Sequence, residues 1–139
     1  MKISLLCVLA FGLGLAAMPA LAHHSFAAEY DNKKPIDLTG TVTKVEWMNP
    51  HARFYLDVKD EKTGAVTNWE FELGSPNGLM RQGWTRNSMK IGDSVSVQGS
   101  LAKDGSNLAN ARTVKLSDGK KLFAGSASET GREEKKGEQ

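Results

Sequence analysis

Hydrophobic and polar residues alternate along much of the central part of the chain, with the period of two that is typical of strands. The stretch DLTGTVTKVEWMN, residues 37–49, predicts a first strand with a bulge or bend at Gly40. The stretches ARFYLDVKD (52–60) and AVTNWEFEL (65–73) predict two more strands, joined by the turn EKTG. Because the connections are short, we expect these three strands to form an antiparallel meander.

The pattern then changes to that of a short helix. In SPNGLMRQGW, residues 75–84, Ser75 is suited to the N-cap and Pro76 to the first helical position. Gly83 provides a residue that can end the helix. We therefore expect one short helix after the third strand.

Alternation resumes after the helix. SVSVQGSLA (94–102) predicts a fourth strand and ANARTVKL (109–116) a fifth, and Leu122 with Phe123 can complete the sheet. Three strands, a helix and two strands is the order of the OB-fold, a five-stranded Greek-key barrel. We expect an all-β, OB-fold-like barrel with one short helix; an unrelated small barrel or sandwich is the alternative.

Residues 1–22 have the features of a cleaved signal peptide. Lys2 precedes an apolar run, and Ala20-Leu21-Ala22 has the small-x-small form of a cleavage site. The apolar run is shorter than the roughly 20 residues of a membrane span. We expect a periplasmic or secreted protein with no membrane attachment after cleavage; an uncleaved anchor is the alternative.

The rest of the chain divides into three parts. Residues 23–34 are expected to form an N-terminal arm, and residues 35–124 the OB-like domain. Residues 125–139 contain no apolar residue larger than alanine and are rich in Gly, Ser, Glu and Lys. Such a composition cannot bury enough surface to offset its ordering entropy, so we expect a disordered tail.

Charge and cysteine content exclude some classes of protein. The formal net charge is +2, from 18 Lys and Arg against 16 Asp and Glu. The chain therefore lacks the large excess of positive charge that is typical of nucleic-acid-binding proteins. The one cysteine, Cys7, would leave with the signal peptide, so the mature protein would have no disulfide. We expect a monomer with no nucleic-acid partner.

Several motifs resemble a known family. HHSFAAEYD, GTVTKVEWMNPHARFYLDV, NWEFELGSPNGLMRQGW and KDGSNLANARTVKL are similar to the DUF6152 type of small exported bacterial proteins. The likeness runs from about Ala22 to Ser126. The family has no established activity, so the resemblance implies export and nothing about chemistry.

The placement of the histidines suggests a metal site. His23 and His24 follow the predicted cleavage site, and His51 lies after Asn49 and Pro50 in the loop expected between the first two strands. A free amine and an imidazole on His23 could chelate one ion, with His51 or His24 supplying a third nitrogen and Asn49 and Pro50 shaping the loop. Such a nitrogen set suits Cu(II). We therefore expect copper binding for carriage or buffering; solvated histidines without a metal are the alternative.

An aromatic surface is the rival site. Tyr55, Trp69 and Trp84, with Arg53 beside them, could bind a peptide or a small anionic ligand without any metal, as OB-folds often do with exposed aromatics. Tryptophans in a small barrel can equally fill its core.

Enzymatic chemistry is poorly supported. The chain has no nucleophile elbow, P-loop or dinucleotide fingerprint. Glu70 and Glu72 share a strand face, which we expect to be exposed. We expect a binding protein rather than an enzyme; an oxidative copper enzyme, which needs an open surface around the ion, is a further alternative.

Overall fold

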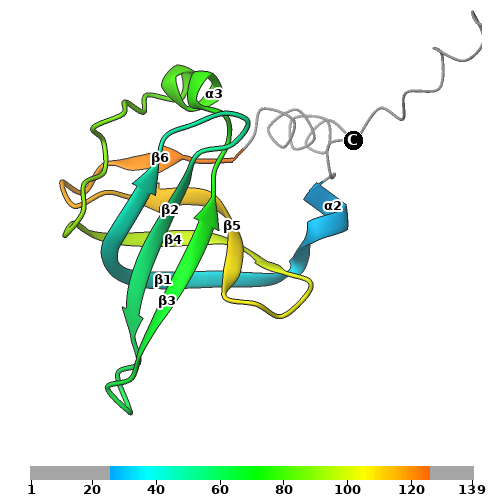
Figure 1. Ribbon diagram of the computed structural model, residues 1–139, viewed down its shortest axis with the longest axis vertical. Helices are drawn as coiled ribbons and strands as arrows, with labels where there is room; N and C mark the ends of the chain where they lie inside the picture. The colour runs from blue at the N-terminus through cyan, green and yellow to red at the C-terminus, as the bar shows by residue number, and fades with distance from the viewer. Residues whose placement is uncertain (1–25, 126–139) are drawn as a thin grey trace, which may run out of the picture.

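The computed structural model describes residues 26–125, in which the alternating stretches form a mostly antiparallel β-sheet of six strands, accompanied by two short helices (Figure 1). The elements in chain order are α2 (Phe26–Glu29), β1 (Tyr30–Glu46), β2 (Arg53–Lys59), β3 (Val66–Glu72), α3 (Pro76–Arg81), β4 (Ser94–Ala102), β5 (Leu108–Lys115) and β6 (Lys121–Phe123). β6 contains Leu122 and Phe123, which were expected to complete the sheet, whereas α2 was not expected.

The first strand is longer than its hydrophobic pattern predicts. β1 begins at Tyr30, inside the segment 23–34 that was expected to be an arm. Tyr30 is 2% exposed and belongs to the buried hydrophobic residues. The register with β4 shifts between Asp31 and Pro35, so the polar residues between them interrupt the alternation without ending the strand.

The sheet order is β3-β2-β1-β4-β5-β6, and β3 pairs in addition with β5. All pairings are antiparallel except β3 with β5, which is parallel. Thr41 marks the point where β1 changes partner, because it pairs with Asp57 of β2 and with Ser94 of β4. A Cβ on the preceding Gly40 would lie 2.5 Å from the carbonyl oxygen of Asp57, so this close approach requires glycine.

Alternation along the strands places one set of side chains in a common core. Phe54 and Phe71 are cross-strand neighbours whose ring centroids lie 5.0 Å apart in a stacked arrangement. The largest fully buried side chains are Phe54, Phe71, Leu56, Leu79, Val42, Val95, Val97 and Val114. Burial of these side chains is the main favourable contribution to the stability of the sheet.

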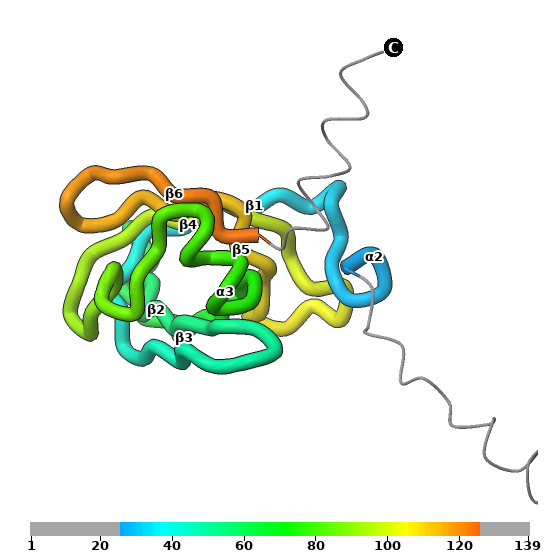
Figure 2. The backbone as a smooth tube through the Cα atoms, turned by 90° about the horizontal axis from the view of Figure 1, so that it is seen from above, coloured from blue at the N-terminus to red at the C-terminus, as the bar shows by residue number. Residues whose placement is uncertain are grey.

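The helix after β3 forms where its caps predict it. The Ser75 hydroxyl accepts a hydrogen bond from the N–H of Gly78, and Pro76 begins the helix. Leu79 is fully buried and anchors α3 to the core. α3 lies at the top end of the sheet in Figure 1, and Figure 2 shows it from above, in front of the strands. Among residues 26–125, no helix is long and apolar enough to cross a membrane.

Candidate functional site

The loop that carries His51 is fixed to the end of β3 by backbone hydrogen bonds. The N–H of Ala52 donates to the carbonyl oxygen of Gly74 at 3.0 Å, and the N–H of Leu73 donates to that of Ala52 at 2.9 Å. These bonds continue the pairing of β2 with β3 beyond the strands themselves. They hold His51 next to Leu73.

The imidazole of His51 is hydrogen-bonded through one of its two ring nitrogens. Nδ1 lies 2.9 Å from the carbonyl oxygen of Leu73, and since a carbonyl can only accept, Nδ1 carries a proton and donates it. Within residues 26–125, no hydrogen bond involves Nε2. The side chain is 35% exposed. In the neutral ring Nε2 therefore offers its lone pair to a ligand from a fixed orientation.

Glu72 is a nearly buried carboxylate that connects three side chains. The Tyr30 hydroxyl donates to Oε2 at 3.1 Å, Nη2 of Arg53 lies 3.5 Å from the same oxygen, and Nδ1 of His51 lies 3.5 Å from Oε1. Glu72 is 9% exposed. The expectation that Glu70 and Glu72 both lie on an exposed face is therefore wrong for Glu72, because Tyr30 of β1 packs over it. Glu70 keeps more solvent contact and accepts from Nη1 of Arg53 at 2.8 Å.

The phenol of Tyr30 is held in its neutral form. Burial, together with the negative charges of Glu72 and Glu29, raises the pKa of Tyr30 far above its ordinary value of 10.0. The hydroxyl therefore remains protonated and remains a hydrogen-bond donor to Glu72 across the physiological pH range.

The short helix α2 packs next to the polar cluster that Tyr30, His51, Arg53 and Glu72 form. The ring of Phe26 lies 5.5 Å from that of Tyr30, measured between centroids. Lys103, in the turn between β4 and β5, donates its backbone N–H to the carbonyl oxygen of Glu29 at 3.0 Å and its Nζ to that of Ala27. Figure 1 shows α2 beside this turn. The beginning of the described chain is thus tied both to the β4–β5 turn and, through Tyr30, to Glu72.

Two of the predicted metal ligands, His23 and His24, lie outside the described residues. His51 is the one histidine within them. Asn49 and Pro50 are exposed in the loop before it, and the peptide bond between them is cis. Residues 26–125 by themselves contain no group of three or more His, Cys, Asp or Glu side chains arranged to hold a metal ion.

Three of the residues expected on the aromatic surface lie on two sides of the sheet. Tyr55 faces outward and donates its hydroxyl to Glu46 at 3.1 Å. Arg53 faces the same way but is engaged by carboxylates. Trp69 is half-buried against the core, with its ring 6.3 Å from that of Phe71.

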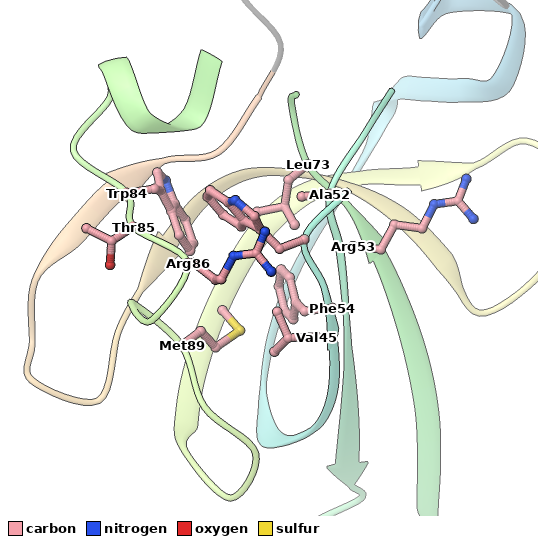
Figure 3. Close-up of a pocket in the computed structure, with 10 residues that line it drawn as sticks. Val45, Ala52, Arg53, Phe54, Leu73, Trp84, Thr85, Arg86 and Met89 are labelled. Atoms are coloured by element: carbon pink, nitrogen blue, oxygen red, sulfur yellow. The ribbon is translucent and has the colours of Figure 1, made fainter. Parts of the chain in front are cut away.

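The fourth of these residues, Trp84, belongs to the core. It is 4% exposed, and its Nε1 donates to the carbonyl oxygen of Phe123 at 2.7 Å. A hollow lies beside it, and in Figure 3 Arg86 and Met89 border this hollow while the guanidinium of Arg53 points away from it. The hollow has a volume of about 10 Å³, close to what a single water requires. The structure therefore does not bring the four residues together on one exposed surface.

The described residues thus define a small β-sheet protein in which Tyr30 and Glu72 link α2 to the partly exposed His51. The chain belongs to the DUF6152 family, a family of unknown function whose sequence model matches residues 12–111. This confirms the resemblance noted from the motifs. A search of curated proteins finds no match to the sequence. The family carries no assigned activity.

Proposed function

We propose that this protein, after export and removal of residues 1–22, binds copper through the amine and imidazole of His23 together with Nε2 of His51. His24 would be the alternative source of the third nitrogen. The protein would carry or buffer the metal in the periplasm or outside the cell, as a monomer, rather than catalyse a reaction.

The observation that carries the proposal is the hydrogen bonding of His51. Histidines that bind metals commonly donate their other ring N–H to a backbone carbonyl or a carboxylate, which fixes the tautomer and the ring orientation. His51 does this with the Leu73 carbonyl, and the Glu72 carboxylate lies beside the same nitrogen. Such an imidazole loses little orientational freedom when Nε2 binds an ion.

The docking of α2 supports the contribution of the N-terminus. His23 precedes Phe26 by about three residues, which is roughly 10 Å of extended chain. Phe26 packs on Tyr30, Tyr30 bonds to Glu72, and Glu72 lies beside His51. His23 therefore precedes, by three residues, a segment that contacts His51 indirectly through Tyr30 and Glu72.

The types of ligand favour copper over zinc. An amine and two imidazoles form a nitrogen set that suits Cu(II), which also binds most tightly among the first-row divalent ions. The sole cysteine is Cys7, which lies before the proposed cleavage site, and a closed structural zinc site usually needs four ligands that include cysteine.

We also propose that the sheet forms an OB-fold-like barrel. The parallel pairing of β3 with β5 joins the strands in the cycle β1-β2-β3-β5-β4, which supports an OB-like barrel with β6 added at the edge of β5. In an OB-fold, the loop between the first two strands is one of those that line binding sites. His51 lies in the corresponding loop of this protein.

A Cu(II) titration of the exported protein tests the proposal. Calorimetry measures the affinity and stoichiometry, and electron paramagnetic resonance reports the coordinating nitrogens. His51→Asn is the decisive variant, because the asparagine amide retains a donor where Nδ1 meets the Leu73 carbonyl but has no equivalent of Nε2. A second variant carries one additional alanine before His23. The free amine then belongs to the alanine and no longer lies on the same residue as the His23 imidazole.

We expect tight one-to-one binding that is weakened in both variants, with a change in the number of coordinating nitrogens. Binding that ignores both changes would end the copper hypothesis and favour the metal-free alternative. Turnover of reductant and oxygen by the loaded protein would instead favour the oxidative copper enzyme.

A further inference from the structure

Four neighbouring strands present a polar face to solvent. The pairings of β1, β4, β5 and β6 align a row of apolar side chains that face the core, namely Leu38, Val97, Val114 and Leu122. Because side chains alternate along a strand, the residues on either side of this row point outward. Six of them line a hollow of about 260 Å³, which we call the polar groove: Asp37, Ser96, Gln98, Thr113, Lys115 and Lys121.

One end of the polar groove carries two positive charges without a counter-charge. Lys115 of β5 and Lys121 of β6 are direct cross-strand partners, and both are exposed. Like charges directly opposite each other on two strands destabilise the pair. Among residues 26–125, neither ammonium group forms a hydrogen bond or an ion pair. The described part of the chain therefore leaves this pair available to an anion.

The rest of the polar groove offers neutral hydrogen-bonding groups and ends at a carboxylate. Ser96 and Gln98 of β4 lie beside β5, where Gln98 is paired with Thr113. Nε2 of Gln98 donates to the carboxylate of Asp37 on β1 at 2.8 Å. Adjacent strands lie about 4.8 Å apart, so β1 and β6, with β4 and β5 between them, are separated by about 14 Å. The groove thus runs from two lysines to one aspartate.

We propose that the polar groove binds a small phosphate monoester, with its phosphate at Lys115 and Lys121 and its hydroxyl groups directed toward Asp37. A phosphate monoester carries a charge of about −1.5 to −2 at pH 7 and three acceptor oxygens, which matches two ammonium groups. The Asp37 carboxylate accepts from hydroxyl groups and repels a second anion.

The size of the groove limits the ligand. Its volume of about 260 Å³ is slightly below the roughly 300–1,000 Å³ of typical small-molecule sites. We therefore expect a short soluble molecule rather than a polymer. The groove contains none of the residues assigned to the copper site, so this inference is independent of the proposed function.

Titration of the exported protein with glycerol 3-phosphate tests the proposal, with nuclear magnetic resonance at low ionic strength as the readout. Lys115→Met and Lys121→Met each remove one charge from the groove. Lys120→Met is the matched control, because it removes the same charge from the adjacent exposed residue, which does not line the groove. We expect saturable shifts of the Thr113, Lys115 and Lys121 amides in wild type. Each groove variant should bind about tenfold more weakly, which corresponds to one hydrogen bond to a charged group.

Lys120→Met should bind like wild type. Equal weakening in Lys120→Met and Lys121→Met, or the absence of saturable shifts in wild type, would overturn the proposal. Lys115 and Lys121 would then be solvated charges that protect the edge strand β6. Shifts that appear only with phosphatidylglycerol vesicles would also overturn it, because the groove would then contact a membrane surface.

The orientation of the ligand is tested with Asp37→Asn and a second probe, inorganic phosphate, which has no hydroxyl-bearing chain. We expect Asp37→Asn to weaken glycerol 3-phosphate about threefold, since a carboxylate accepts more strongly than an amide. Binding of inorganic phosphate should not weaken, because the change removes a negative charge. Equal effects of Asp37→Asn on both probes would refute the placement of the hydroxyl groups at Asp37.

Discussion

Two tyrosine–glutamate hydrogen bonds of equal length should differ sharply in their contribution to stability. Tyr30 donates to Glu72 and Tyr55 donates to Glu46, each at 3.1 Å. Tyr30 is 2% exposed and Glu72 is 9% exposed, so water has little access to replace the lost bond. A hydrogen bond to a charged group contributes about 1.5–3 kcal/mol, and we expect Tyr30→Phe to lower the free energy of unfolding by about that amount.

Tyr55→Phe should cost much less. The Tyr55 side chain is only half-buried and Glu46 also pairs with Lys44, so solvent and the lysine can satisfy the carboxylate after the hydroxyl is removed. We expect a loss of about 0.5 kcal/mol or less, at the lower end for a hydrogen bond. The contrast between the two variants tests the role of burial directly, because the chemical change is the same.

Urea unfolding of both variants and of wild type measures the difference. The comparison is valid where the dependence of the unfolding free energy on urea has the same slope in all three proteins. A Tyr30→Phe variant within about 0.5 kcal/mol of Tyr55→Phe, on the scale of ordinary surface changes, would refute the argument that Glu72 and Tyr30 form a water-excluded bond.

The remaining predictions concern the sheet, the helix and one turn. Gly99→Ala should destabilise the protein by about 3 kcal/mol or more, because a Cβ would collide with the carbonyl oxygen of Asn110; Gly92→Ala, which meets only the strain of a positive φ, should cost about 1 kcal/mol in the same thermal or urea unfolding assay. Leu79→Ala should cost about 2–5 kcal/mol, since Leu79 is fully buried, and a loss under about 1 kcal/mol would mean that α3 is not anchored by it. The backbone N–H groups of the turn after Asp60 lower the pKa of its carboxyl below 3.8. The stability that this contact contributes is thus present above the unfolded-state pKa and is lost as the pH falls through the folded-state pKa; a titration of Asp60 by nuclear magnetic resonance with a midpoint at or above 3.8 would contradict this.

Most of the strands could be predicted because their alternation is regular. β4 has the bounds that the pattern of residues 94–102 indicates, and the helix follows from its cap at Ser75. The beginning of β1 was missed because DNKK, residues 31–34, carries no apolar side chain. The strand continues there because the register shift between Asp31 and Pro35 accommodates these residues within the pairing to β4.

The candidate site was predictable only in part, since its partners come from distant segments. The loop position of His51 follows from the strand order, but its bond to the Leu73 carbonyl depends on backbone pairing beyond the strand ends. Glu72 was taken as exposed because no nearby residue in the chain covers it. In the hairpin that the turn EKTG predicts, Arg53 lies opposite Glu72. This pairing of opposite charges across two strands could have indicated an ion pair.

The cluster also indicates why a glutamate, rather than the similarly sized glutamine, stands at position 72. Oε1 faces the Nδ1–H of His51, and Oε2 faces donors from Tyr30 and Arg53. A carboxylate accepts at both oxygens, whereas an amide must present an NH₂ group on one side. In either orientation that group would oppose N–H donors, those of Arg53 or that of His51. One carboxylate is therefore the simplest group that can accept from Tyr30 and lie beside the Nδ1–H of His51 at the same time, and this requirement couples the position of Tyr30, on which Phe26 of α2 packs, to the orientation of the His51 ring.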